Sequence, residues 1–164
     1  MGKFSIEIKY AALFTIAMLA WTIGEKEAGF HDKNISSYLS VSLLSGIVGL
    51  VVYFFALFEK KRKYFQGTMT WAQGFVSGIF LSFFIALLSP LAQLIVFQAI
   101  SPELLKNLAH YAVSHGGMTQ KQAEVYFSFR SYAIQAAFTS LSVGVLTAAL
   151  IALVLKTKPK ADTK

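Results

Sequence analysis

The stretch from Thr70 to Ile100 constrains the fold more than any other part of the chain, because it contains no charged residue. It is longer than the roughly 20 apolar residues that an α-helix needs to cross the hydrocarbon core of a bilayer. Small side chains recur along it at every fourth position, where they share one face of a helix. Such residues let the backbones of membrane helices approach closely. The stretch therefore predicts a transmembrane helix whose contact face is formed by Gly74, Gly78, Ser82 and Ala86.

The composition agrees with a membrane protein. Of 164 residues, 14% are charged and 55% are hydrophobic, whereas about 25% of the residues in a soluble domain are charged. The absence of cysteine excludes disulfide bonds and thiolate metal sites. The net charge is +7, but the basic residues gather at the ends of apolar runs, where lipid headgroups lie. No nucleic-acid partner is therefore expected.

Four apolar runs predict the architecture. They indicate an all-α, integral-membrane four-helix bundle that forms one domain over residues 1–155. A basic, disordered tail is expected at residues 156–164. The predicted spans cover residues 10–24, 37–58, 70–100 and 131–155.

Two helix starts lie between the third and fourth spans. The first, Ser101-Pro102-Glu103, has the cap, proline and acidic residue that are typical of a helix start. It predicts a short amphipathic helix over residues 102–114. The second is the capping-box pair of Thr119 and Gln122. The helix that begins there is expected to continue unbroken into the fourth span.

The fourth span carries its own row of small residues, which includes Ser140, Gly144 and Ala148. Because the third and fourth spans both carry such a row, we expect them to be antiparallel neighbours. Pro90 has no amide hydrogen and predicts a kink in the third span. Ser89 is placed to satisfy a carbonyl that the proline leaves without a donor.

The distribution of positive charge predicts the orientation. Ten of the 15 Lys and Arg residues lie in the N-terminal segment, the middle loop and the tail, and five lie in the other two loops. The positive-inside rule therefore places both termini in the cytoplasm. The middle loop is expected to meet anionic lipid headgroups through Lys60, Lys61, Arg62 and Lys63.

The turn into the third span carries a longer pattern, Tyr64-x-x-Gly67-x-Met69-Thr70-Trp71-x-Gln73-Gly74-x-x-x-Gly78. This pattern resembles the signature of domain-of-unknown-function family 4199. The likeness extends over nearly the whole chain and includes the Ser101-Pro102 helix start and Met118-Thr119 before the fourth span. The resemblance implies a four-span protein of the bacterial inner membrane, of a kind common in Bacteroidetes. It implies no known activity and no functional residues.

A polar cluster follows the first span. Glu27 and His31 are four residues apart and would share a face if the helix continued through them. With Asp32, and with His110 from the next outward loop, they are the candidate metal ligands. The alternative is a hydrated, salt-bridged helix end, because a metal site needs a fuller ligand set. We expect no cofactor.

The predicted spans themselves contain no Asp, Glu, Lys, Arg or His. No phosphate-binding loop and no nucleophile elbow occurs, so no catalytic residue is predicted and the chain is not expected to be an enzyme. We expect a non-enzymatic structural or assembly subunit that packs with itself or within an envelope complex. One alternative is a small-solute channel or transporter subunit, and another is a metal-dependent membrane enzyme.

Overall fold

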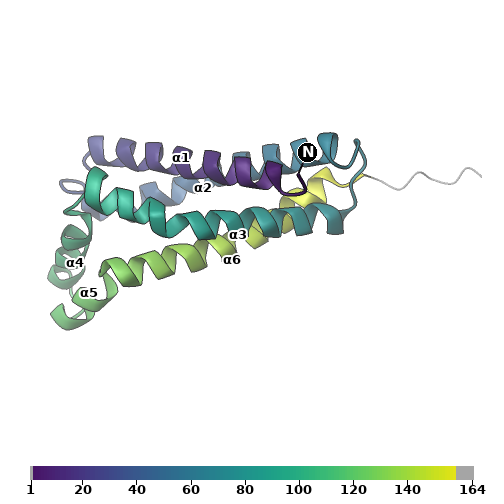
Figure 1. Ribbon diagram of the computed structural model, residues 1–164. Coiled ribbons are helices and arrows are strands. Elements are labelled where there is room, and N and C mark those ends of the chain that lie inside the picture. Colours follow the sequence, from purple (N-terminus) through teal and green to yellow (C-terminus); the bar gives the residue numbers. More distant parts are fainter. Residues whose placement is uncertain (1, 158–164) are drawn as a thin grey trace, which may run out of the picture.

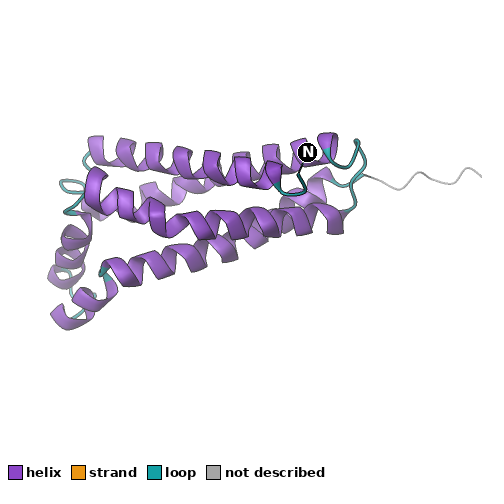
Figure 2. Ribbon diagram, viewed as in Figure 1, coloured by secondary structure: helices purple, strands orange, loops and turns teal. Residues whose placement is uncertain are grey.

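The computed structural model describes residues 2–157, and within them the regular structure is entirely helical (Figure 2). The predicted disordered tail falls mostly on residues 158–164, outside the described residues. The elements are α1 (Ser5–Glu27), η1 (Ile35–Ser37), α2 (Tyr38–Lys63), α3 (Trp71–Ile95), the π-helix η2 (Val96–Ile100), α4 (Leu104–Ser114), α5 (Gln120–Tyr126) and α6 (Phe129–Leu155).

Four helical segments are long and apolar enough to cross a membrane, and this confirms the predicted all-α membrane helical fold. Their long axes run side by side, and the short helices α4 and α5 cover one end of the molecule (Figure 1). We call this the α4 end. The start of α1, the turn between α2 and α3, and the last turn of α6 meet at the opposite end, which we call the N-terminal end (Figure 1).

Among the described residues, helices α3 and α6 share the most extensive helix–helix contact. A Cβ atom added at Gly78 would lie 2.2 Å from the Cβ atom of Ala148. One added at Gly144 would lie 2.6 Å from the hydroxyl oxygen of Ser82. Glycine is therefore needed at both positions for the two backbones to come this close. Further along the same helices, Ala86 and Ser140 are only half-buried.

The third span continues through Pro90 without losing its helical conformation. The Ser89 hydroxyl donates a hydrogen bond to the carbonyl of Ala86, at 3.2 Å. That carbonyl lies four residues before the proline, so its usual amide donor is missing. After Ile95 the helix widens into a π-turn, which ends where the amide of Ser101 donates to the carbonyl of Val96 at 2.7 Å.

The first two membrane-crossing helices are longer than predicted. Helix α1 begins at Ser5 and ends at Glu27, and α2 continues to Lys63. Both helices therefore carry buried ionisable side chains, which lie outside the predicted spans. The helices extend beyond the apolar runs because Glu and Lys are good helix formers.

The helix that begins after Thr119 does not continue into the fourth span, contrary to expectation. It ends at Tyr126, and α6 starts at Phe129. Between them Ser128 adopts an extended conformation, and its hydroxyl accepts a hydrogen bond from the amide of Ser131. This new cap lets the chain change direction, since α5 packs on α4 whereas α6 runs alongside α3.

Candidate functional site

A buried acidic side chain and a buried imidazole lie close together near the α4 end. Glu25 is 6% exposed and His31 is 3% exposed. They come from the last turn of α1 and from the loop that follows it. Residues of α2, α3, η2, α4 and α6 complete the surroundings. We call this group the polar site, and define it as Trp21, Glu25, His31, Tyr38, Ser42 and Tyr132.

The loop after α1 places His31 next to Glu25. Gly29 has a φ of +79°, a left-handed conformation that glycine adopts without strain, and it reverses the chain just after the helix. The amide of Asn34 then donates to the carbonyl of Gly29, at 2.8 Å. From α4, the side-chain amide of Asn107 donates to the carbonyl of His31, at 2.9 Å. Asn107 thus holds the backbone of His31 and makes no hydrogen bond with its imidazole ring.

The two oxygens of the Glu25 carboxylate have different surroundings. Oε1 accepts hydrogen bonds from the indole Nε1 of Trp21 at 2.8 Å and from the hydroxyl of Ser42 at 2.7 Å. Oε2 lies 3.6 Å from Nε2 of His31. The donors to Oε1 are both neutral, and among residues 2–157 His31, if protonated, is the one side chain paired with this carboxylate that would carry positive charge.

The His31 ring itself lacks hydrogen-bond partners. Both ring nitrogens are buried, and neither has a partner among the described residues. The ring packs edge-on against Tyr38, with 5.6 Å between the ring centroids and 74° between the planes. Buried polar atoms are nearly always hydrogen-bonded in folded proteins, so an unpartnered imidazole points to a polar ligand or a water molecule.

A small cavity of about 140 Å³ lies beside the carboxylate. Its lining combines polar groups with aromatic rings, and Glu25 is the only lining residue that carries a formal charge at neutral pH. The arrangement offers an anion, hydroxyl groups and ring faces to whatever enters. The lining residues include Trp21, Glu25, Tyr38, Ser42 and Tyr132.

At the N-terminal end a second pair of charges is buried. The ammonium of Lys60 lies 2.8 Å from a carboxylate oxygen of Glu7, and both side chains are 4% exposed. Lys60 also donates to the carbonyl of Lys3 and lies over the ring of Tyr64. This pair is fully bonded and joins the start of α1 to the end of α2.

The neighbouring basic side chains also contact the protein. Lys61 donates to the carbonyl of Leu155 at the end of α6, at 2.8 Å. Lys63 pairs with Glu59, which also accepts from Lys9. Arg62 is exposed, and its guanidinium lies over the ring of Phe58. Most of this cluster, which the sequence assigns to lipid headgroups, thus makes bonds inside the protein.

The candidate metal ligands do not gather. Glu27, Asp32 and His110 are exposed, whereas His31 is buried. Helix α1 ends at Glu27, so the helical continuation that would place Glu27 and His31 on one face does not occur. Within residues 2–157 no three acidic or histidine side chains come close enough to hold a metal ion.

The sequence did contain a signal for the polar site. Trp21 and Glu25 are one helical turn apart, which is the spacing at which an indole can donate to a carboxylate. The contributions of Tyr38 and Tyr132 had no such signal, because each comes from a different helix than Glu25.

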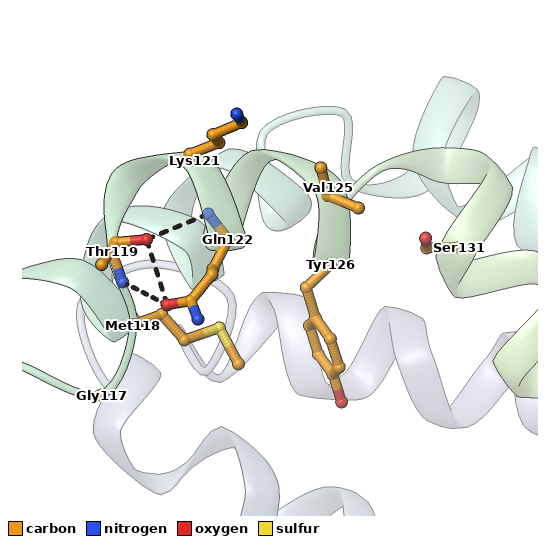
Figure 3. A pocket seen from close by; sticks show the side chains of 8 residues that line it. All are labelled: Gly117, Met118, Thr119, Lys121, Gln122, Val125, Tyr126 and Ser131. Carbon is orange, nitrogen blue, oxygen red and sulfur yellow. Dashed lines mark hydrogen bonds between the residues drawn. The ribbon is translucent and has the colours of Figure 1, made fainter.

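A larger hollow of about 700 Å³ lies beside α5 (Figure 3). Two of its polar side chains, Thr119 and Gln122, form a capping box with each other and are thereby occupied (Figure 3). Most of the residues that line this hollow are exposed, whereas Glu25 and His31 of the polar site are buried.

Comparison with known proteins gives one match. A family model described as protein of unknown function (DUF4199) matches residues 9–157. No curated protein and no solved structure matches the chain.

Proposed function

The chain belongs to the DUF4199 family, and we propose that it is a multi-pass membrane protein that binds a small monovalent cation at the polar site. This is the solute-binding role expected of a channel or transporter subunit. The observation that carries the proposal is the buried Glu25 carboxylate, which lines a cavity and has only neutral hydrogen-bond donors.

An ionised carboxylate needs a counter-charge when it is buried in a membrane protein. Without one, the loss of hydration costs several kcal/mol. This cost is comparable to the total free energy of unfolding of a small domain. Ionisable groups inside membrane bundles therefore tend to mark ion pathways or ligand sites. At the polar site the counter-charge can come from a protonated His31 or from a bound cation next to Glu25.

The cavity suits a small cation in size and in lining. Liquid water takes up roughly 30 Å³ per molecule, so a volume of about 140 Å³ holds about four to five water-sized groups. Aromatic rings attract cations through their faces, and Trp is the strongest of them. Trp21, Tyr38 and Tyr132 line the cavity together with the carboxylate.

The second candidate function is the structural or assembly subunit that the sequence favours. Gly46 on α2 supports it, because nothing lies within 4 Å of the position that its Cβ atom would occupy. Another helix could approach closely there, either from a second copy or from an envelope complex. Under both candidates the protein is non-enzymatic.

We also propose the bacterial inner membrane as the location, with both termini in the cytoplasm. The supporting observation is the excess of Lys and Arg in the N-terminal segment, the middle loop and the C-terminal part of the sequence. In this orientation the polar site lies toward the outer face. Arg62 and Lys63, the exposed members of the basic cluster, would then face the anionic headgroups of the inner leaflet.

Fluorescence of Trp21 tests the cation-binding proposal directly. The chain has two tryptophans, so Trp71→Phe, at the N-terminal end, leaves Trp21 as the only reporter. In this background, Na⁺, K⁺, ammonium and tetramethylammonium are titrated at constant ionic strength into the purified protein. We expect saturable quenching by at least one of them, and Glu25→Gln should weaken that binding by at least about tenfold, the loss of one contact to a charged group.

Glu27→Gln is the matched control. It also removes one carboxylate charge, but Glu27 is exposed and lies two residues after Glu25. Equal effects of the two substitutions, or no saturable response to any cation, would refute the proposed site. Uptake of the bound cation into proteoliposomes then tests the transport role. Binding without any flux would refute the channel or transporter role and would leave the assembly role.

A further inference from the structure

An apolar groove of about 600 Å³ runs between α3 and α6 toward the α4 end. The two helices touch closely at Gly78 and Gly144 and then diverge toward α4 (Figure 1). Where they have separated, small side chains such as Ala133 and Ala137 do not fill the space between them. Phe83 and Leu87 line the opposite wall.

Arg130 is the only charged residue that lines this groove. It lies in the first turn of α6, is exposed, and forms no ion pair within the described part of the chain. A cation there does not stabilise the helix, because the N-terminal end of a helix dipole favours negative charge. The same dipole and the guanidinium would both attract a phosphate group.

The length of the groove matches one leaflet of a bilayer. From Arg130 to Leu141 a helix rises about 16 Å, and half of the roughly 30 Å hydrocarbon core is about 15 Å. When the phosphate of a phospholipid is bonded to Arg130, an acyl chain of the same lipid can therefore lie along the groove as far as the middle of the bilayer. No acidic side chain lines the groove to pair with the amine of a zwitterionic lipid.

We propose that this groove is a binding site for one phospholipid with an anionic headgroup. Arg130 holds the phosphate, and the space between Phe83, Leu87, Ala133 and Ala137 takes an acyl chain. This site is separate from the polar site and does not depend on cation binding.

Native mass spectrometry of the full chain tests the proposal, with phosphatidylglycerol and phosphatidylcholine added in turn. We expect a one-to-one adduct that forms with phosphatidylglycerol in preference to phosphatidylcholine. Arg130→Gln should reduce its affinity by about tenfold, the effect of losing a charge-assisted hydrogen bond. Lys121→Gln is the control, because Lys121 is an exposed cation at the same end but outside the groove.

Ala137→Trp fills the groove without changing its charge and should also remove the adduct. The thermal stability of the Ala137→Trp variant is compared with that of the unsubstituted chain. If this variant fails to fold, Arg130→Gln still tests the proposal, because Arg130 is exposed. Equal binding of the two lipids, or equal effects of Arg130→Gln and Lys121→Gln, would overturn the proposal. A dimer that dissociates on Ala137→Trp, in place of a lipid adduct, would assign the groove to a second copy and would also overturn it.

Discussion

The buried pair of Glu7 and Lys60 allows a quantitative test of how the N-terminal end is held together. We consider Glu7→Leu and Lys60→Met, made singly and together. Each single substitution leaves one charge buried without its partner, because both side chains are 4% exposed and the ion pair measures 2.8 Å. Removing one member of such a pair typically costs about 3–5 kcal/mol of unfolding free energy.

The double substitution should recover most of that loss. Replacing both members by apolar residues of similar volume is often neutral, since neither charge then has to be desolvated. A residual cost of about 1–3 kcal/mol is expected, because Lys60 also donates to the carbonyl of Lys3, which would lose its donor. The free energy of unfolding is measured by titration with SDS in mixed micelles, followed by circular dichroism.

Lys9→Met is the control for this cycle. It breaks the contact with Glu59, but the Lys9 side chain is 47% exposed, so the expected cost is at most about 1 kcal/mol. Single substitutions at Glu7 and Lys60 that each cost less than the control would refute the reasoning. So would a double substitution that costs the sum of the two singles, since the charges would then act independently.

Two further predictions concern packing and topology. Gly78→Ala should cost about 1–3 kcal/mol in the same SDS titration, because the new Cβ atom would lie 2.2 Å from that of Ala148. Adding Ala148→Gly should restore part of it, and a double substitution no more stable than Gly78→Ala alone would contradict this contact. Reporter fusions at Lys61 should read as cytoplasmic and at Gly116 as external, as the charge distribution predicts. A cytoplasmic reading at Gly116 would contradict the four-span arrangement.

Local features of the chain were enough to predict the membrane-crossing helices. The uncharged stretch from Thr70 to Ile100 is expected to be an α-helix in a bilayer, because its backbone groups must form hydrogen bonds within the segment. The cap at Thr119 was also predictable from the sequence, since it joins residues only three positions apart. The family was also recognisable from the order of short motifs along the chain.

The polar site was not predictable in this way. The sequence shows that Glu25 and His31 follow an apolar run, but not that both are buried. Their burial depends on Tyr38, on Tyr132 and on the placement of α4, which come from three other elements. Glu27 was a candidate neighbour of His31 only if the helix continued through both residues, and Gly29 turns the chain between them.

The sequence by itself therefore determined which segments are helices that can cross a membrane, and the tertiary structure decided which charges are buried and what they contact. The physical reason is the distance along the chain between the residues that interact. Hydrophobic length and helix capping act within one segment, so neighbouring residues are sufficient to specify them. The surroundings of Glu25, Lys60 and Arg130 depend on side chains from other helices, and these come together only when the helices pack.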